Sequence, residues 1–316
     1  MARLKRSRLL DLAGLAMAGA GAVGLVVRLT VRDGWPLAAN LFYVLPTLMI
    51  AVLFGLASVV WWVNRRRVTA LVCAGLTLLM SGVWGRDAAY FGRGCEPSPA
   101  SFRVLLWNTA RGVAGWPRVA EQMARADPDL IGLVEAGGSG EDAKAFWLAR
   151  FPQHEAYMAG AGMVILVRGR IVEHRTLPVA GTSRCAVVEA EVRGSRLRVV
   201  VLDAIVRPFS DRREVVRQVF ELARSASAVP TIVMGDFNTP VDSVWFEDPR
   251  GEYVHAFEFA GRGMLGTWPV PLPVLAIDHI WVSRGLDVRC ARIGWSWFSD
   301  HRPMMADLSF TGTNDR

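Results

Sequence analysis

Three long apolar runs in the first 90 residues constrain what this chain can fold into. They cover residues 9–27, 37–63 and 68–85, and Asp11 is the only charged residue within them. Each run is long enough to cross a hydrocarbon layer of about 30 Å as a helix. A cleavable signal peptide would explain the first run but not the other two. Residues 1–90 are therefore predicted to form a membrane anchor of three transmembrane helices, in preference to three buried helices of a soluble domain.

The distribution of basic residues predicts the orientation of this anchor. Four basic residues precede the first run, and the three arginines 65–67 separate the second run from the third. The loop between the first two runs has only Arg28 and Arg32, followed by Asp33. Because the more basic loops of a membrane protein stay in the cytoplasm, we expect a multi-pass protein of the cell membrane with a cytoplasmic N-terminus. After three crossings, everything beyond residue 90 lies outside the cytoplasm.

The net charge of +7 belongs to the membrane segment. Residues 1–99 contain 11 Lys and Arg against 4 Asp and Glu. The remainder contains 25 of each, from 36 − 11 and 29 − 4, and is formally neutral. Because a nucleic-acid-binding domain usually carries an excess of positive charge, the basic balance is no evidence for nucleic-acid binding.

The four cysteines give little guidance. Cys73 lies in the third apolar run, and Cys95, Cys185 and Cys290 lie in the outer part. An outer compartment would allow a Cys185–Cys290 disulfide, but the spacing does not support one. We expect buried free thiols instead.

The outer part begins with a linker and continues as one domain. Residues 91–100 are rich in Gly, Pro and Ser, which is typical of linkers. Residues 101–312 are enough for one substantial domain, and apolar strands dominate it. Helices are predicted over residues 116–126, 141–150 and 211–225. This order of elements predicts two β-sheets packed face to face with helices outside, an α/β sandwich.

Two pairs of neighbouring strands are predicted within this domain. Residues 163–167 and 171–177 flank Arg168-Gly169-Arg170, and we expect them to form a hairpin. Residues 184–192 and 197–202 flank Arg193-Gly194-Ser195 in the same way.

Polar residues stand where several apolar strands stop. They are Asn108, Glu135, Asp236, Asn238, Asp278, His279, Asp300 and His301. Asp236 and Asn238 follow the buried strand 231–234 and, in an extended segment, point to the same side. The plain alternative is a turn, which Asp and Asn both favour. Because buried carboxylates are costly unless they are paired or bound to metal, the whole set favours a chemical site.

These residues lie in segments that resemble the endonuclease/exonuclease/phosphatase superfamily. The matching segments, in family order, are Leu106-Trp107-Asn108, Asp129 to Glu135, Gly235-Asp236-Phe237-Asn238, Thr267-Trp268, Ile277-Asp278-His279-Ile280 and Ser299-Asp300-His301-Arg302-Pro303. The four-residue match around Asp236 is weak alone, whereas the ordered set across about residues 101–310 is strong. The resemblance implies a four-layered α/β sandwich.

The resemblance also implies a metal site and a reaction. Glu135 resembles the main ligand of a divalent metal, helped by Asn108 and Asp300. Oxygen ligands of this kind suit Mg²⁺ or Mn²⁺. The reaction implied is metal-assisted hydrolysis of a phosphoester by in-line attack of water.

Four further residues receive catalytic roles from the resemblance. Asp236 resembles the residue that orients or deprotonates the attacking water. Asn238 would hold a phosphate oxygen. His301 would stabilise the charge that develops on the phosphorus group, and Asp278 would orient its imidazole.

The sequence departs from the family pattern at two positions. Val134 stands where the family often has Gln. Asp203 stands at the end of a strand where the family usually has a His that donates to the scissile phosphate. An ionised Asp about 4 Å from a phosphate oxygen is repelled by about 4 kcal/mol at an effective dielectric constant of about 20. Asp203 is therefore a second metal ligand, a partner of Arg207, a strand cap outside the site, or a sign of weakened activity.

The sequence thus predicts a membrane-anchored, Mg²⁺- or Mn²⁺-dependent phosphoesterase that acts outside the cytoplasm. Its substrate is a phosphoester, in a nucleic acid or in a phospholipid head group, and no obligate protein partner is evident. The alternative is a catalytically silent family member that binds a lipid or a partner. A transporter or channel is disfavoured because the predicted spans carry no charge pathway.

Overall fold

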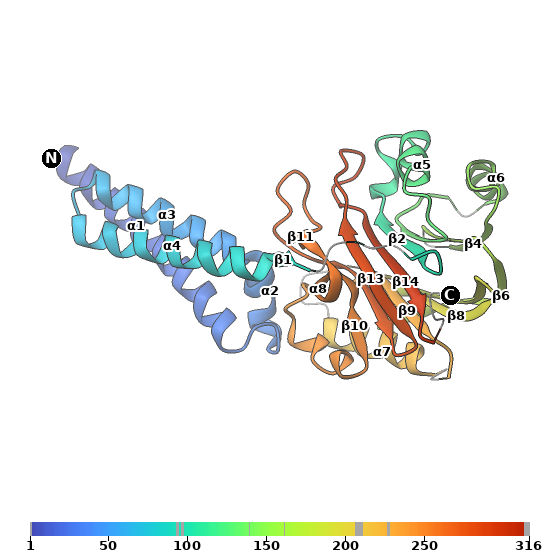
Figure 1. Ribbon diagram of the computed structural model, residues 1–316. Coiled ribbons are helices and arrows are strands. Elements are labelled where there is room, and N and C mark those ends of the chain that lie inside the picture. Colours follow the sequence, from blue (N-terminus) through green and yellow to red (C-terminus); the bar gives the residue numbers. More distant parts are fainter. Residues whose placement is uncertain are drawn as a thin grey trace. The chain divides into compact units, whose positions relative to one another are not determined.

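The computed structural model describes residues 2–92, 95, 98–138, 140–160, 162–205, 211–225 and 228–312, with side chains from Arg6 onward (Figure 1). It divides into two compact units, Met1–Ala89 and Tyr90–Arg316. Each unit is described by itself.

The first unit consists of apolar helices. They are α1 (Ala2–Leu29), α2 (Pro36–Val44), α3 (Thr47–Val63) and α4 (Arg67–Ala88). Two of the described helices, α1 and α4, are long and apolar enough to cross a membrane on their own. The pair α2 and α3 meets the same criterion only when the two are taken together, so the unit has two candidate spans, or three if the pair counts as one.

The segment 37–63 is broken, where a single apolar run was expected. The axes of α2 and α3 differ by 68° at the break. Pro46 is the N-cap residue of α3, with an extended backbone. Its ring disfavours helical geometry at the preceding residue, Leu45, and it has no N–H to continue the helix.

Small residues of α1 allow α3 to approach closely. A Cβ added at Gly14 would lie 2.7 Å from the Trp61 ring, and one added at Gly21 would lie 3.2 Å from Phe54. Small residues at the contact are typical of helices that associate within a lipid bilayer, because they let the two backbones approach closely.

The second unit contains two six-stranded sheets (Figure 1). The first sheet has the order β13 (Leu286–Ile293), β14 (Met304–Phe310), β2 (Phe102–Asn108), β3 (Leu130–Val134), β5 (Met163–Val167), β4 (Glu155–Gly160). The second has the order β10 (Tyr253–His255), β12 (Asp278–Ser283), β9 (Thr231–Asp236), β8 (Ser195–Asp203), β7 (Ser183–Val192), β6 (Arg170–Val179). A separate short pair joins β1 (Ala89–Phe91) to β11 (Arg262–Met264).

Alternation along the strands builds four layers. In β2, Val104 and Leu106 face the second sheet, whereas Leu105 and Trp107 face outward. The helices α5 (Trp116–Ala124) and α6 (Glu141–Arg150) cover this outer face, and α7 (Arg212–Arg224) covers the other sheet. The predicted four-layered α/β sandwich is confirmed, and its core lies between the sheets. The short helix α8 (Ala256–Ala260) follows β10, and 3₁₀ turns cover Ala110–Gly112, Val244–Phe246 and Pro249–Gly251.

One predicted hairpin is wrong and the other is present. β5 pairs with β3 and β4, whereas β6 belongs to the other sheet. The chain passes between the sheets at Gly169, where a Cβ would lie 2.0 Å from the Glu191 carbonyl oxygen. The short connection that looks like a turn is therefore a crossing between layers. The second predicted pair forms the antiparallel hairpin of β7 and β8.

The cysteine expectation is wrong in part. Cys95 and Cys290 form a disulfide, so the linker is bonded to β13. Cys185 is a buried free thiol in β7, as expected, and Cys73 is also free. The pairing joins residues 195 positions apart and has no signature in the spacing.

Candidate active site

Strand pairing brings the predicted residues to one edge of the sandwich. β2 and β3 are parallel, with Asn108 opposite Val134, so Glu135 follows directly beside Asn108. β8 and β9 are also parallel, with Asp203 opposite Asp236. Because parallel strands end at the same side of a sheet, each sheet delivers two polar residues to this edge.

Two antiparallel strands complete the edge. β12 begins at Asp278, which lies opposite Asp236 in the register with β9. β14 begins at Met304, opposite Leu106 of β2, so the preceding His301 lies near the end of β2.

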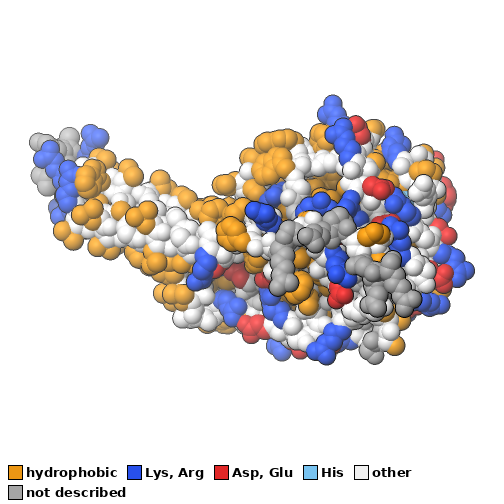
Figure 2. Space-filling view, viewed as in Figure 1, with side chains coloured by type: hydrophobic (Ala, Val, Ile, Leu, Met, Phe, Trp, Pro, Cys, Tyr) orange, Lys and Arg blue, Asp and Glu red, His pale blue; other side chains and the backbone are white. Residues whose placement is uncertain are grey.

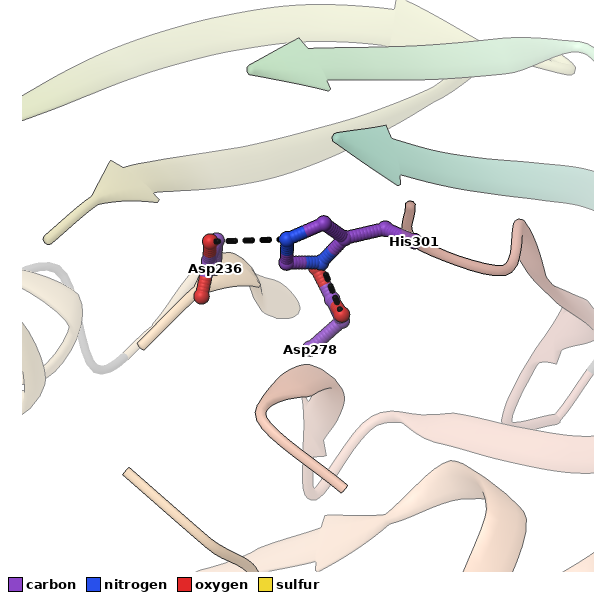
Figure 3. Close-up of side chains that lie close together, drawn as sticks. All are labelled: Asp236, Asp278 and His301. Atoms are coloured by element: carbon purple, nitrogen blue, oxygen red, sulfur yellow. Dashed lines mark hydrogen bonds and ion pairs between the residues drawn. The ribbon is translucent and has the colours of Figure 1, made fainter. Parts of the chain in front are cut away.

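His301 lies between two buried carboxylates (Figure 3). Its Nδ1 is 2.8 Å from Asp278 Oδ2, and its Nε2 is 3.9 Å from Asp236 Oδ2. The Trp107 indole N–H donates to the His301 carbonyl at 2.9 Å, which holds the backbone from which the ring projects. The other oxygen of Asp278, Oδ1, has no hydrogen-bond partner among the described residues.

Burial and mutual charge shift the pKa values of this group. Burial alone would lower the pKa of His301, but the carboxylates of Asp278, Asp236 and Asp300 together outweigh it and raise the pKa to about 10. Burial, together with nearby Asp278, raises the pKa of Asp236 to about 8. The imidazole is therefore protonated at neutral pH, and the Asp236 carboxyl keeps its proton to a higher pH than an ordinary aspartate does.

Asn108 connects the two sheets at this edge. Its Nδ2 donates to Asp236 Oδ2 at 3.0 Å and to Glu135 Oε1 at 3.3 Å. Its Oδ1 accepts the Ala110 N–H at 3.0 Å. Glu135 has a positive φ of 49°, so the chain turns sharply after β3 and leaves the carboxylate partly exposed.

Arg111 belongs to this edge, and the sequence did not single it out. Its Nε is 3.2 Å from Glu135 Oε2, and its side chain is 82% exposed. Ala110 and Arg111 both have positive φ, which turns the guanidinium back toward the strand ends. The available signal was a basic residue three positions after Asn108, in a turn that ends with Gly112.

Asp203 lies at the same edge and interacts electrostatically with the site. Burial and the nearby Glu135 carboxylate raise the pKa of Asp203 to about 6, opposed by Arg111 and His301. Its carboxylate makes no hydrogen bond to a described residue. Arg207, its suggested partner, lies outside the described residues.

Asn238 does not continue the strand as expected. Its φ is 49°, and its backbone N–H donates to Asp236 Oδ1 at 2.9 Å. This local bond closes a tight turn, which Asn tolerates better than most residues. The Asn238 amide donates one N–H to the Ala204 carbonyl at 2.7 Å, and its second N–H remains for another acceptor.

Asp300 is exposed and held by the Thr267-Trp268 segment. Its Oδ2 accepts the Trp268 indole N–H at 3.0 Å. Among the described residues, no hydrogen bond joins it to Glu135 or Asn108. The neighbouring Ser299 hydroxyl donates to the Asn108 carbonyl at 2.8 Å, which keeps this loop next to β2.

His279 is a structural residue beside the site. Its side chain is fully buried, with Nε2 2.8 Å from the Thr239 carbonyl and Nδ1 3.2 Å from His255 Nε2. Burial lowers its pKa to about 4, so it stays neutral. It supports the turn after Asp236 and does not face the site.

Comparison with known proteins identifies a family that this chain matches. A family model described as the Endonuclease/Exonuclease/phosphatase family matches residues 105–301. The chain belongs to this family. Its members hydrolyse phosphoester bonds and typically use divalent metals. No curated protein matches the chain significantly.

Several solved structures share the fold. The catalytic domain of human Nocturnin, with bound sulfate, is 18% identical with a TM-score of 0.57, covering 69% of this chain and 97% of that one. A mannosyl-6-phosphatase of Bacteroides thetaiotaomicron is 19% identical with a TM-score of 0.54, covering 66% and 100%. Zebrafish (D. rerio) TDP2 with a single-stranded DNA product is 12% identical with a TM-score of 0.54, covering 66% and 99%. At these identities the likeness shows the fold and not the substrate.

The donor chemistry at the edge fits a divalent metal. The negative charges of Glu135 and Asp203 repel each other, and a bound cation would offset this repulsion. Their oxygen atoms are the ligands that Mg²⁺ and Mn²⁺ prefer. Asp236, Asp278 and His301 also lie close enough to hold an ion. An ion there would have to replace the His301–Asp278 hydrogen bond.

The histidine–carboxylate pair generates a prediction. Asp278→Asn keeps the shape of the side chain and removes its charge, so the His301 pKa should fall from about 10 toward the ordinary value of about 6.5. Turnover of a phosphodiester should fall by about 10²- to 10⁴-fold. NMR titration of the His301 ring protons and steady-state kinetics measure the two effects. Asp287→Asn, at an exposed carboxylate of β13, is the control; an unchanged His301 titration in Asp278→Asn would contradict the pairing.

Proposed function

We propose that this family member is a membrane-anchored, divalent-metal-dependent phosphodiesterase or phosphatase acting outside the cytoplasm. The observation that carries the proposal is the buried His301 between Asp278 and Asp236, beside Asn108 and Glu135. Burying two carboxylates and an imidazole together is costly for stability unless they are paired. Such an arrangement is typical of catalytic sites, where pKa values are displaced.

The residues divide the chemistry between them. Asp236, in its ionised form, accepts a proton from the attacking water and orients it toward phosphorus. His301, protonated and held by Asp278, stabilises the negative charge on the phosphoryl oxygens. The free N–H of Asn238 donates to one of these oxygens, and the exposed Arg111 supplies a second cation to them.

Glu135 and Asp300 would hold the metal, with Asn108 contributing through its amide oxygen Oδ1, which in this structure accepts the Ala110 N–H. When bound, a divalent ion polarises the phosphoryl oxygens and offsets developing charge. In the described structure Glu135 forms an ion pair with Arg111, and Asp300 accepts a hydrogen bond from Trp268. A metal held by Glu135 would take the place of the Arg111 guanidinium, which would then be free to bind substrate.

Two observations support a domain outside the cytoplasm. Clusters of basic residues precede the first and the third apolar runs, and such clusters favour the cytoplasmic side. The Cys95–Cys290 disulfide fits an oxidising compartment, because cytosolic thiols are kept reduced.

The orientation can be tested with a fusion after Arg316. Alkaline phosphatase, which needs export to become active, should be active there, and green fluorescent protein should stay dark. The Cys95–Cys290 pair should also be recovered oxidised from cells quenched with a thiol-blocking reagent. A bright fluorescent fusion with both cysteines reduced would place the domain in the cytoplasm.

The metal role is tested at Glu135. Glu135→Gln should abolish turnover and weaken Mg²⁺ or Mn²⁺ binding with the fold intact, because the amide offers a poorer ligand of the same shape. The assay uses the full chain in detergent, with DNA, RNA, phospholipids and sugar phosphates as substrates. Glu141→Gln, at the exposed first turn of α6, is the control. Full activity in Glu135→Gln would remove this carboxylate from the site.

Asp203 decides between an active and a silent family member. If its charge weakens an otherwise competent site, Asp203→His should raise kcat/KM, since one donor to a developing oxyanion is worth about 2.7–4 kcal/mol. If Asp203 holds the metal, both Asp203→His and Asp203→Asn should lose turnover and metal affinity. The measurement is kcat/KM with a metal titration for the three proteins. No change in either variant would place Asp203 outside the chemistry.

A further inference from the structure

Exposed apolar side chains gather around the candidate site. Among the described residues after Ala89, nine large apolar side chains are exposed. Five of them lie on the loops at the site edge: Val113, Ile205, Leu272, Trp295 and Trp297. Figure 2 shows hydrophobic side chains on this edge of the domain, over the loop between β11 and β12.

Each of these residues belongs to a segment that supplies a polar residue to the site. Val113 follows Arg111 by two positions, and Ile205 follows Asp203 by two. Trp295 and Trp297 precede Asp300 in the loop between β13 and β14. Leu272 follows Trp268 in the loop before β12. The apolar residues therefore lie in the same loops as residues of the site.

Two of the loops are fastened to each other. Arg302 Nη1 donates to the Gly266 carbonyl at 2.7 Å, and its Nε donates to the Gly294 carbonyl at 3.0 Å. The Val270 N–H donates to the Asp300 carbonyl at 2.8 Å. Leu272 and Trp297 are 63% and 69% exposed, and these hydrogen bonds hold the loops that carry them.

The tryptophans have the chemistry of a membrane interface. The rings of Trp295 and Trp297 pack edge to face at 5.5 Å, and the Arg302 guanidinium lies 5.5 Å from the Trp295 ring. An indole ring with one polar N–H favours the zone between lipid head groups and hydrocarbon. A large exposed apolar group in water has an unfavourable hydration free energy that such a zone removes.

The chain itself keeps a bilayer within reach. The candidate span α4 ends at Ala88, and the domain already holds Tyr90, whose ring packs on Phe257 at 5.7 Å. The Gly92 N–H then donates to the Gly261 carbonyl at 3.0 Å. Four residues from Ala88 to Gly92 extend about 14 Å at most. If α4 spans a membrane, a lipid surface is the partner always present.

We propose that Val113, Ile205, Leu272, Trp295 and Trp297 form a rim that seats in the head-group zone of the bilayer, so that the site hydrolyses phosphoesters of membrane lipid head groups. This inference rests on the proposed function and names its substrate class. The rim excludes water around a head group while Arg111 and the polar strand ends meet its phosphate.

The kinetic test compares one lipid substrate with one soluble substrate. The full chain is reconstituted in vesicles of phosphatidylcholine and phosphatidylglycerol, with Mn²⁺, and hydrolysis of these lipids is measured beside that of soluble bis(p-nitrophenyl) phosphate. In the double variant Leu272→Ser, Trp297→Ser, lipid turnover should fall about tenfold or more, because each lost anchor weakens binding to the interface. Turnover of the soluble diester should change less than about twofold.

The control is Val172→Ser, at an exposed apolar position on β6, which should leave both reactions unchanged. Equal losses on both substrates, or no loss on lipid, would overturn the inference. Loss of single-stranded DNA hydrolysis alone would show that the tryptophans stack bases instead. Wild-type turnover of the soluble diester without any lipid turnover would overturn the inference and leave the proposed function standing.

A second measurement reads the rim without turnover. Brominated lipids quench tryptophan fluorescence at the depth of the bromine, and Trp295→Phe, Trp297→Phe should reduce the quenched fraction of the full chain. An unchanged quenched fraction would overturn the rim. Quenching without hydrolysis of any substrate would instead support the rim and overturn the proposed function.

Discussion

The site depends on parallel pairing in both sheets. β2 with β3 and β8 with β9 each end at the same side, so the four residues at their ends meet without any long loop. Asn108 then bonds across the two sheets to Asp236, which ties the register of one sheet to that of the other. A slip of one residue in either pair would turn its polar end residue toward the other face of the sheet. The same strand register is therefore needed to pack the core of the sandwich and to place the polar residues at its edge.

Much of this arrangement could be predicted from sequence because it follows from strand ends. Apolar runs that stop at a polar residue locate Asn108, Glu135 and Asp236. The ordered segments around Asp278 and His301 identify the family. Two hydrogen bonds join the segment around Asn108 to the segment around His301. The Trp107 indole N–H donates to the His301 carbonyl, and the Ser299 hydroxyl donates to the Asn108 carbonyl.

The rest required three dimensions. The crossing at Gly169 has the same local sequence features as a hairpin, and only pairing to other strands distinguishes them. The Cys95–Cys290 bond depends on where the linker lies, which no spacing encodes. Arg111 reaches Glu135 through two residues with positive φ, and Asn238 turns because a carboxylate captures its N–H. Each of these depends on the path of the backbone in three dimensions.

The disulfide also affects how the protein is made. It joins residues 195 positions apart, and Cys290 lies in the penultimate strand. The bond can form only after almost the whole chain has been synthesised, and, for an exported domain, after that strand has crossed the bilayer. In the folded protein, noncovalent contacts of Tyr90 and Gly92 also hold the start of the second unit. Covalent closure is thus one of the last steps in biogenesis, and a chain truncated before β13 could never acquire it.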